Sequence, residues 1–282
     1  MMRATVGGII KIMDRLAPPW LAEEWDNVGL QIGDRRLPVR RIWIALDPIP
    51  EVVEAACEKD IDLLITHHPM IFRPLKSIDF ETPGGAIILK ACQHHLAIFS
   101  AHTNLDIVRE GVNDVLAKRL GLKDLEVLQP FKESNAPGND NAAPVDTEVQ
   151  HGIGRIGSLA KAASLESLAL MVKDKLKLKF AKVTGNPDLK VTRVAICSGS
   201  GSSLMQTFIS SDAQVYISGD IHYHDARDAE SVNRGIIDIG HFPSEHLMVA
   251  ALAHQLGKMV KREGFKITVE ACNIEKDPFI IL

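Results

Sequence analysis

The sequence contains little cysteine, and none of it is spaced as in a structural zinc site. The four cysteines, Cys57, Cys92, Cys197 and Cys272, lie far apart with no Cys-x2-Cys pair, and each is in or beside an apolar segment. This distribution is typical of buried thiols in a reducing compartment and argues against a disulfide framework. We therefore expect a cytoplasmic protein.

Long apolar runs and an excess of basic charge are also absent. The first apolar stretch is interrupted by Lys11, Asp14 and Arg15, which predicts an amphipathic helix instead of a signal peptide, and no run reaches the length of a membrane span. A formal net charge of -4 with a pI near 6.3 provides no overall basic field for nucleic acid. Neither a membrane nor a nucleic acid is the expected partner.

Two common catalytic arrangements are missing as well. The cluster CSGSGSSL at 197–204 is neither a G-x-x-x-x-G-K-[ST] loop nor a dinucleotide fingerprint. It predicts either an anion or substrate contact at a helix start or only a tight turn from strand to helix. The chain has no G-x-S-x-G elbow, and no cysteine has a plausible base beside it in the sequence, so nucleophilic catalysis is unsupported.

What the chain does contain is an internal repeat. Residues 41–68 give a short apolar strand, a helix that starts at a proline, and a second apolar strand. Residues 193–220 give the same order at an offset of 152 positions, which matches Arg41 with Arg193. Each half then continues with another helix and another strand.

This repeat sets the expected fold class. Apolar strands that alternate with helices predict an α/β protein with two internally duplicated α/β repeats, whose mixed, mainly parallel sheets are covered by helices. We expect the first repeat at 1–130, a polar loop at 131–150, and the second repeat at 151–282, with its C-terminal part packing back on the first. A helical pattern near the C-terminus predicts a packed face of Leu247, Ala250, Ala251, His254 and Leu256.

Histidines and acidic residues follow the strands of both halves. The stretches IFSAHTNLD at 98–106 and IGHFPSE at 239–245 each place an acidic residue four positions after a histidine, and DLLITHH ends another strand with two histidines. The carboxyl ends of parallel strands open onto the crevice where ligands bind. We expect a shared metal centre formed by His67, His68, His102, Asp106, His241 and Glu245.

The donor types of this set indicate its chemistry. Imidazole and carboxylate groups without thiolate suit Zn, Mn, Fe or Ni in a hydrolytic site with open positions. Because a carboxylate can bridge two cations, the set is able to hold a pair of divalent ions. Any one of these histidines alone fits a structural or solvated role better than a ligand role, and only their combination at strand ends favours a metal centre.

Four other histidines receive different interpretations. His222 and His224 follow the strand that matches DLLITHH in the repeat, and they are candidates for catalysis, as a general acid or base or as a phosphate contact. His94 and His95 are expected to cap a helix or to face solvent.

Several stretches together resemble one protein family. EEWDNVGLQIG, ITHHP, SAHTNLD, CSGSGSS, SGDIHYHDA and GHFPSEH, in this order, are similar to the motifs of the NIF-three-like family, or GTP cyclohydrolase I type 2 homologs. The resemblance covers nearly the whole chain and is weakest at 132–148. It implies two intertwined α/β repeats, two divalent metal ions per chain, and ring-shaped homo-oligomers, commonly hexamers.

The resemblance also implies roles for individual residues. It assigns metal-ligand positions to His67, His68, Asp106, His241 and Glu245. Glu245 is then the bridging ligand, whereas His102 matches a position that is a ligand in only some members. The family commonly has Gly-Glu where this chain has Gly219-Asp220, which leaves the contact made from that position open. Some relatives carry an inserted small domain, and this chain resembles the compact members.

Two functions are compatible with these features. The first is a metal-dependent hydrolase that acts on a nucleotide or a related phosphorylated small molecule, by ring opening of GTP or by phosphoester hydrolysis. The second is a non-catalytic metal-binding oligomer that handles metal or serves as an interaction scaffold. A defined substrate pocket beside the ions would favour the first function, and a closed, water-poor site would favour the second.

Overall fold

The computed structural model describes residues 4–131 and 150–281, and the chain divides into two compact units. Unit 1 contains Met1–Leu105 and Met248–Pro278, and unit 2 contains Asp106–Leu247 and Phe279–Leu282. Most of the polar loop expected at 131–150 lies outside the described residues. Each unit has one mixed sheet with helices, which confirms the expected α/β fold class.

Unit 1 is built on a five-stranded sheet in the order β1-β4-β3-β2-β11. Its strands are β1 (Gly29–Ile32), β2 (Arg41–Ala45), β3 (Leu63–Thr66), β4 (Ala97–Ser100) and β11 (Thr268–Ala271). All neighbouring strands are parallel except β1 and β4. The strand β11 comes from the C-terminal part of the chain, so unit 1 is closed by residues that follow unit 2 in sequence.

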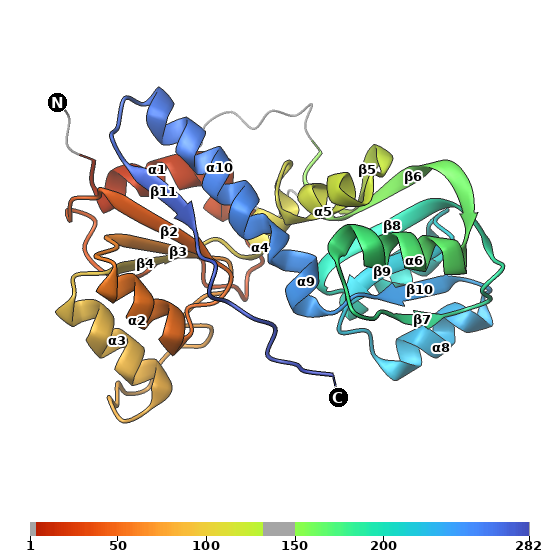
Figure 1. The fold of residues 1–282 in the computed structure, drawn as a ribbon, viewed down its shortest axis with the longest axis horizontal. Helices are drawn as coiled ribbons and strands as arrows, with labels where there is room; N and C mark the ends of the chain where they lie inside the picture. The colour runs from red at the N-terminus through yellow and green to blue at the C-terminus, as the bar shows by residue number, and fades with distance from the viewer. Residues whose placement is uncertain (1–3, 132–149, 282) are drawn as a thin grey trace. The chain divides into compact units, whose positions relative to one another are not determined.

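Helices cover both faces of this sheet. Figure 1 shows α1 (Val6–Leu16) and α10 (Leu247–Arg262) on one face, and α2 (Pro50–Glu58) and α3 (Pro83–Gln93) on the other. The amphipathic helix expected at the start of the chain is α1, which begins where the Thr5 hydroxyl accepts a hydrogen bond from Gly8 N–H.

The packed face predicted for the C-terminal helix is correct at Leu256 and wrong at Ala250 and His254. The residues that α10 buries are Met248, Val249, Leu252, Ala253, Leu256 and Val260. Ala250 and His254 are exposed. Alanine is tolerated on the buried and on the exposed side of a helix, so alanines alone do not locate the buried stripe. In α10 the larger side chains of Met248 and Val260 define the buried side.

Unit 2 has a six-stranded sheet in the order β5-β6-β8-β9-β10-β7. Its strands are β5 (Lys123–Pro130), β6 (Gly152–Ser164), β7 (Lys182–Thr184), β8 (Lys190–Ser200), β9 (Val215–Gly219) and β10 (Gly235–Asp238). The central strands β8, β9 and β10 are parallel, and β5, β6 and β7 join them in antiparallel pairs.

Alternate residues of the central strands pack on different helices. Val194 and Ile196 contribute to a cluster with α5 (Val112–Leu120) and α6 (Leu165–Leu176), whereas Ala195 and Cys197 contribute to a cluster with α7 (Met205–Ser210) and α8 (Tyr223–Ser231). Successive side chains point to opposite faces of the sheet, and helices cover both faces. The strands are therefore apolar at consecutive positions of the sequence.

Equivalent hydrogen bonds, as well as the same strand order, occur within each of the two units. The Asp62 carboxylate in unit 1 accepts a hydrogen bond from Arg41 N–H, and Gln214 Oε1 in unit 2 accepts one from Arg193 N–H, at the same offset of 152 positions. The parallel pairs β2/β3 and β8/β9 also have the same register at this offset. The internal repeat read from the sequence is therefore present in the backbone.

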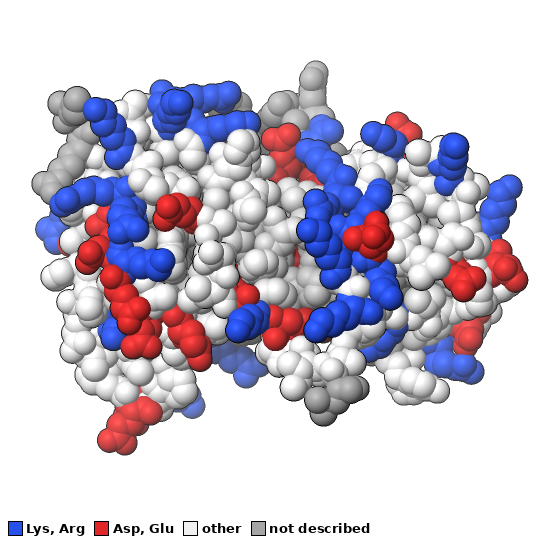
Figure 2. Space-filling model, in the orientation of Figure 1, with Lys and Arg blue, Asp and Glu red and all other residues white. Residues whose placement is uncertain are grey.

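Basic side chains gather at one place in unit 2. Figure 2 shows Lys and Arg concentrated over the C-terminal ends of α5 and α6, with mixed charges on the rest of the visible face. The basic residues in the last turns of these helices are Lys118, Arg119, Lys173 and Lys175. Cations at helix C-termini offset the negative end of the helix dipole, so this patch has a structural explanation. No described helix combines the length and the hydropathy needed to cross a bilayer.

A buried ion pair holds the start of α5 to the sheet of unit 2. Arg155 on β6 is 2% exposed and donates to Asp114 Oδ2 through Nε (3.0 Å) and Nη2 (2.6 Å). Its other hydrogen bonds go to the backbone carbonyls of Gly152, Gly154 and Val108. The guanidinium is thus fully satisfied only while Asp114 is present.

We predict that Asp114→Ala lowers the free energy of unfolding by about 3–5 kcal/mol, because it leaves a buried guanidinium without its counter-charge. Urea denaturation followed by circular dichroism measures this change. The double variant Asp114→Ala/Arg155→Met should recover a large part of the loss. Equal destabilisation by the single and double variants would show that the pair acts only through packing.

Candidate metal centre

The two His-x3-acid motifs continue from their strands into short helices. β4 ends at Ser100 and is followed by α4 (Thr103–Ile107), and β10 ends at Asp238 and is followed by α9 (His241–Glu245). Residues four apart lie on the same side of a helix. The spacing in both motifs is therefore one helical turn, located just beyond the carboxyl end of a strand.

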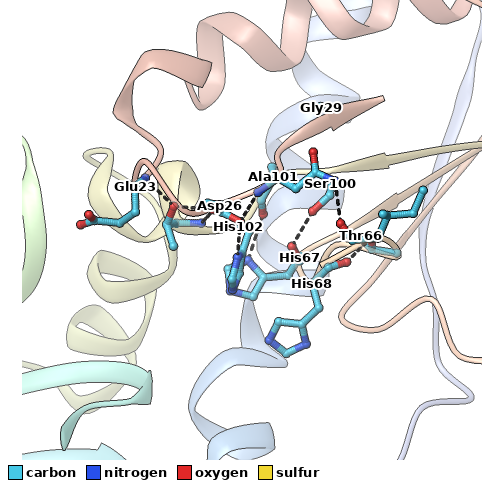
Figure 3. A network of polar contacts seen from close by, with 12 residues as sticks. Glu23, Asp26, Gly29, Thr66, His67, His68, Ser100, Ala101 and His102 are labelled. Atoms are coloured by element: carbon cyan, nitrogen blue, oxygen red, sulfur yellow. Dashed lines mark hydrogen bonds and ion pairs between the residues drawn. The ribbon is translucent and has the colours of Figure 1, made fainter. Parts of the chain in front are cut away.

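Three imidazoles meet at the strand ends of unit 1. His67 and His68 follow β3, and His102 follows β4; their ring centroids are 5.1, 5.2 and 5.5 Å apart. Each offers a ligand atom, and these atoms all lie within 4.8 Å of one another. Figure 3 shows the three rings beside one another. This arrangement fits a metal ion, because three neutral imidazoles are a frequent ligand set for Zn²⁺ and related ions.

The orientation of His67 is fixed by backbone groups. Its Nδ1 lies 3.0 Å from the carbonyl oxygen of Ala101, and its own carbonyl accepts a hydrogen bond from the Ser100 hydroxyl at 2.9 Å. A carbonyl oxygen can only accept, so Nδ1 carries the hydrogen. Nε2 is then the nitrogen with a lone pair, and it is the atom that can bind a cation.

Carboxylates fix the other two rings of unit 1 in the same way. His68 Nδ1 lies 2.7 Å from Asp47 Oδ1, and His102 Nδ1 lies 2.9 Å from Asp26 Oδ1. Hydrogen bonds of this type set the tautomer and raise the basicity of the nitrogen that faces the metal. All three imidazoles of unit 1 are therefore held with Nε2 as the ligand atom.

Asp26 also anchors the helix that follows His102. Its Oδ2 accepts hydrogen bonds from the backbone N–H and the hydroxyl of Thr103, the first residue of α4. Burial alone would raise the pKa of Asp26, but the hydrogen bonds from His102 and Thr103 together outweigh it and lower this pKa to about 2. The side chain of Asp26, with no exposed surface, is therefore an ionised acceptor at neutral pH.

Asp47 is positioned from the C-terminal part of the chain. Its backbone N–H and that of Leu46 donate to the Glu275 carboxylate at 2.8 and 2.9 Å. Glu275 follows β11, which pairs with β2. The residues after β11 thus hold the loop that orients His68.

In unit 2, His241 lies between two carboxylates. Its Nδ1 is 2.7 Å from Asp220 Oδ2, and its Nε2 is 2.9 Å from Glu245 Oε2. With Nδ1 donating to Asp220, Nε2 and the carboxylate oxygen are both acceptors, and such close contact requires a proton or a metal ion between them. Neighbouring ligands of one octahedral ion lie about 3 Å apart when each metal–ligand bond is ~2.1 Å, so this pair also fits a cation.

Two buried acids lie at the end of β8. Asp106 is 8% exposed and its Oδ1 is 3.3 Å from the Ser198 hydroxyl; Glu245 is 4% exposed and lies against Gly199. Burial raises the pKa of the neighbouring Cys197 thiol to about 12, and the charges of Asp106 and Glu245 act in the same direction. Two carboxylates close to one buried group are stabilised by a cation, which suits this end of the strand for metal binding.

Gly199 makes room for the Glu245 carboxylate. Its φ of +65° is in the left-handed region, and a Cβ at this position would lie 2.2 Å from Glu245 Oε1. The backbone N–H of Gly199 donates to the Ser244 hydroxyl at 2.8 Å, which holds α9 against this turn. The Gly-Ser cluster at 197–204 thus serves as a tight turn that packs against the helix carrying Glu245.

The residues expected to be catalytic, His222 and His224, are exposed at the start of α8. His222 Nδ1 is 3.5 Å from Asp225, and the His224 ring contacts Tyr223. Neither belongs to the groups of metal-binding side chains found among the described residues. Their catalytic role stays a prediction. His94 and His95 are exposed after α3, as expected.

Three carboxylates that orient imidazoles received no such role from the sequence. Asp26 lies within the EEWDNVGLQIG stretch, Asp47 is the second residue after β2, and Asp220 directly follows β9. An acid placed just after an apolar strand, as Asp47 and Asp220 are, was the available signal. Asp220 also answers the question raised by Gly219-Asp220, since the shorter side chain reaches His241.

The fold and these side chains define an α/β protein with imidazole and carboxylate groups that can hold a metal ion. A sequence model of the Duf34/NIF3 (NGG1p interacting factor 3) family matches residues 4–278, and the chain belongs to this family. The family resemblance read from the motifs is thereby confirmed.

Named relatives match over nearly their full length. The chain is 28% identical to the GTP cyclohydrolase 1 type 2 homolog of Bacillus subtilis, covering 100% of both chains, and 33% identical to that of Streptococcus pneumoniae, covering 96% of this chain and 97% of the relative. The first alignment spans 374 residues and the second 275, so the B. subtilis relative carries additional residues that this chain of 282 lacks.

Solved structures with the same fold include a Bacillus cereus protein related to NIF3, with a TM-score of 0.91, 29% identity and 100% coverage of both chains. Reduced HcgD from Methanocaldococcus jannaschii has a TM-score of 0.77 and 26% identity, and the match covers 96% of this chain and 98% of HcgD.

We predict that Gly199→Ala lowers the metal content of the purified protein, because its Cβ displaces the Glu245 carboxylate. Plasma mass spectrometry measures this content. Gly264→Ala is the matched control: Gly264 also has a positive φ, +78°, but no atom lies within 4 Å of the added Cβ. Both variants should lose about 1–2 kcal/mol of stability through backbone strain. Equal metal contents would contradict the assignment of Glu245 to the centre.

We also predict that Asp26→Asn weakens divalent-metal binding by about 10–100-fold, because the amide leaves His102 less basic and less firmly oriented. Titration calorimetry with Zn²⁺ measures the change.

The same variant tests the charge of Asp26. Because the folded-state pKa is below the unfolded value of about 3.9, its contribution to stability is present above pH ~4 and is lost as the pH falls towards 2. The stability difference between wild type and Asp26→Asn should therefore shrink below pH ~4. Asp34→Asn, which removes a partly exposed carboxylate paired with Arg36, should not change metal affinity noticeably.

Proposed function

We propose that the protein is a metal-dependent hydrolase in which His67, His68, His102, Asp106, His241 and Glu245 hold two divalent ions. The observation that carries the proposal is the set of imidazoles whose Nδ1 atoms are engaged by protein acceptors, which commits Nε2 to a ligand role. The proposed set contains two carboxylates besides its imidazoles, so it balances the charge of two cations better than imidazoles alone would.

The donor set supports hydrolysis in preference to redox or structural roles. Closed structural sites typically use thiolates, and this set has none. Imidazole and carboxylate ligands are typical of hydrolytic sites, in which some positions on the metal stay open for water and substrate. When bound, divalent ions in such a site lower the pKa of a water molecule and polarise the bond to be cleaved. The chain contributes the orientation of the ligands through Asp26, Asp47 and Asp220.

The substrate proposed is a nucleotide or a related phosphorylated small molecule, in keeping with the relatives named GTP cyclohydrolase 1 type 2 homolog. His222 and His224 are exposed imidazoles that follow the strand equivalent to the one before His67, and they are proposed to move the proton of the leaving group or to contact a phosphate. The bound ions are proposed to be Zn, Fe, Mn or Ni.

A second candidate function is a metal-binding scaffold without turnover. The observation that favours it is the large exposed apolar surface near the C-terminus, where Phe279 is 81% and Ile280 is 80% exposed. Such surfaces mark association sites. The scaffold function predicts assembly into a homo-oligomer, and a hexameric ring is the expected form.

The test begins with metal-free protein. Chelator-treated protein should bind close to two divalent ions per chain, and His241→Ala should bind fewer. Binding to the folded state alone adds about 2.7 kcal/mol of stability at a hundredfold excess over Kd, so His241→Ala should lower the thermal midpoint of the loaded protein and leave the apo midpoint unchanged. His254→Ala, which removes an exposed histidine on α10, should alter neither.

Turnover is then assayed with the loaded protein on a panel of nucleotides and phosphoesters, by released phosphate and by the absorbance change of purine ring opening. Hydrolysis that depends on metal and is lost in His241→Ala supports the hydrolase. Full loading without turnover of any compound supports the scaffold instead.

A further inference from the structure

We propose that Trp25 and Phe72 form a platform in unit 1 that binds the planar ring of a heteroaromatic ligand carrying an anionic group. The platform rests on the proposed function, because it assigns the ring to the substrate of the neighbouring imidazole cluster. It adds a binding site for a part of the ligand that no metal ion would hold.

Two large aromatic side chains are exposed side by side. Trp25 is 59% exposed and Phe72 is 49% exposed, and their ring centroids are 5.7 Å apart with an interplanar angle of 59°. Exposed aromatic surface of this kind is unfavourable in water unless a ligand or partner covers it. The pair is therefore a candidate for binding.

Both rings adjoin the imidazole cluster. The His102 ring centroid is 6.0 Å from that of Trp25 and 6.5 Å from that of Phe72, with interplanar angles of 76° and 73°. The imidazole is thus nearly perpendicular to both rings and is not stacked on either of them. A ligand ring that stacks on the platform would lie next to the His102 ring.

Hydrogen bonds hold the two aromatic segments together. Asn27 Nδ2 donates to the Ile71 carbonyl at 2.6 Å, and Ile71 N–H donates to Gln31 Oε1 at 3.2 Å. Asn27 Nδ2 also lies 3.2 Å from the same Gln31 oxygen. These bonds connect the residue before Phe72 to the segment after Trp25. A platform held in place before binding loses less entropy when the ligand arrives.

The neighbouring residue Asp26 fixes Trp25 from the other side. Asp26 points inward to His102 and Thr103, whereas the preceding side chain, Trp25, is exposed. One short segment thereby orients a metal-binding imidazole and presents an aromatic ring beside it.

Charge on the same loop favours an anionic ligand. Arg73 directly follows Phe72, is exposed, and makes no ion pair among the described residues; Lys76 is exposed in the same loop. A guanidinium beside an aromatic ring suits a phosphate attached to a stacking base. The loop also exposes Leu75, Ile78 and Phe80, so a second copy of the chain is the competing occupant.

The experiment compares two probes that share a phosphate, AMP and ribose 5-phosphate, by titration calorimetry on Zn-loaded full-length protein. AMP should bind at least about tenfold more tightly, since a stacked base contributes a factor of roughly 5–150. Trp25→Leu and Phe72→Leu should lose most of this preference while ribose 5-phosphate affinity and zinc content stay unchanged. Trp25→Phe, which keeps a ring, should retain most of it.

Phe180→Leu is the matched control, because Phe180 in unit 2 is also 49% exposed. It should leave AMP affinity unchanged. Equal affinities for AMP and ribose 5-phosphate, or equal effects of Phe72→Leu and Phe180→Leu, overturn the platform. A smaller assembly in light scattering for Trp25→Leu also overturns it, in favour of a second copy as occupant.

Failure of the platform and failure of the proposed function give different results. If Trp25→Leu abolishes the preference for AMP but no compound is turned over by wild type, the platform stands and the hydrolase does not. If wild type hydrolyses a nucleotide and neither Trp25→Leu nor Phe72→Leu changes KM, the hydrolase stands and the platform does not.

Discussion

The candidate centre depends on hydrogen bonds made by the Nδ1 atoms of its histidines. An imidazole can present either nitrogen to a cation, and the acceptor at Nδ1 decides which one. In this chain the acceptors are the Ala101 carbonyl and the carboxylates of Asp26, Asp47 and Asp220. Without them the rings would rotate and share their protons with water. The ligand set is therefore defined by groups that would not themselves touch a metal.

Both units supply such acceptors at the ends of parallel strands. Asp47 lies in the loop after β2 and Asp220 in the loop after β9, both at the carboxyl ends of parallel strands. Strand ends bring loops together because parallel neighbours finish at the same edge. Both units therefore carry an imidazole bonded to an acid at this kind of edge, although the acids follow strands that do not correspond in the repeat. Asp47 and Asp220 do not occupy matching positions of the repeat, so the acids that orient the imidazoles were not duplicated residue by residue.

Much of the fold was predictable from the sequence, and less of the site. Strands buried on both faces leave continuous apolar runs in the sequence, and these runs recur at an offset of 152 positions. Together the two features predict the duplicated sheets. The partnership of Asp26 with His102 joins residues 76 positions apart, and no local pattern contains that pairing. The buried side of α10 was misplaced for a related reason, since alanines tolerate either environment and only contacts with other elements decide.

The acceptors at Nδ1 also make the histidines chemically unequal. His67 bonds to a neutral carbonyl, whereas His68 and His102 bond to carboxylates, and a charged acceptor raises the basicity of the opposite nitrogen more than a neutral one does. His67 is thus the weakest donor of the three in unit 1, and an ion bound mainly by it would retain more Lewis acidity. The difference arises from one backbone carbonyl, so it is set by the course of the chain after β4 and not by the choice of ligand residues.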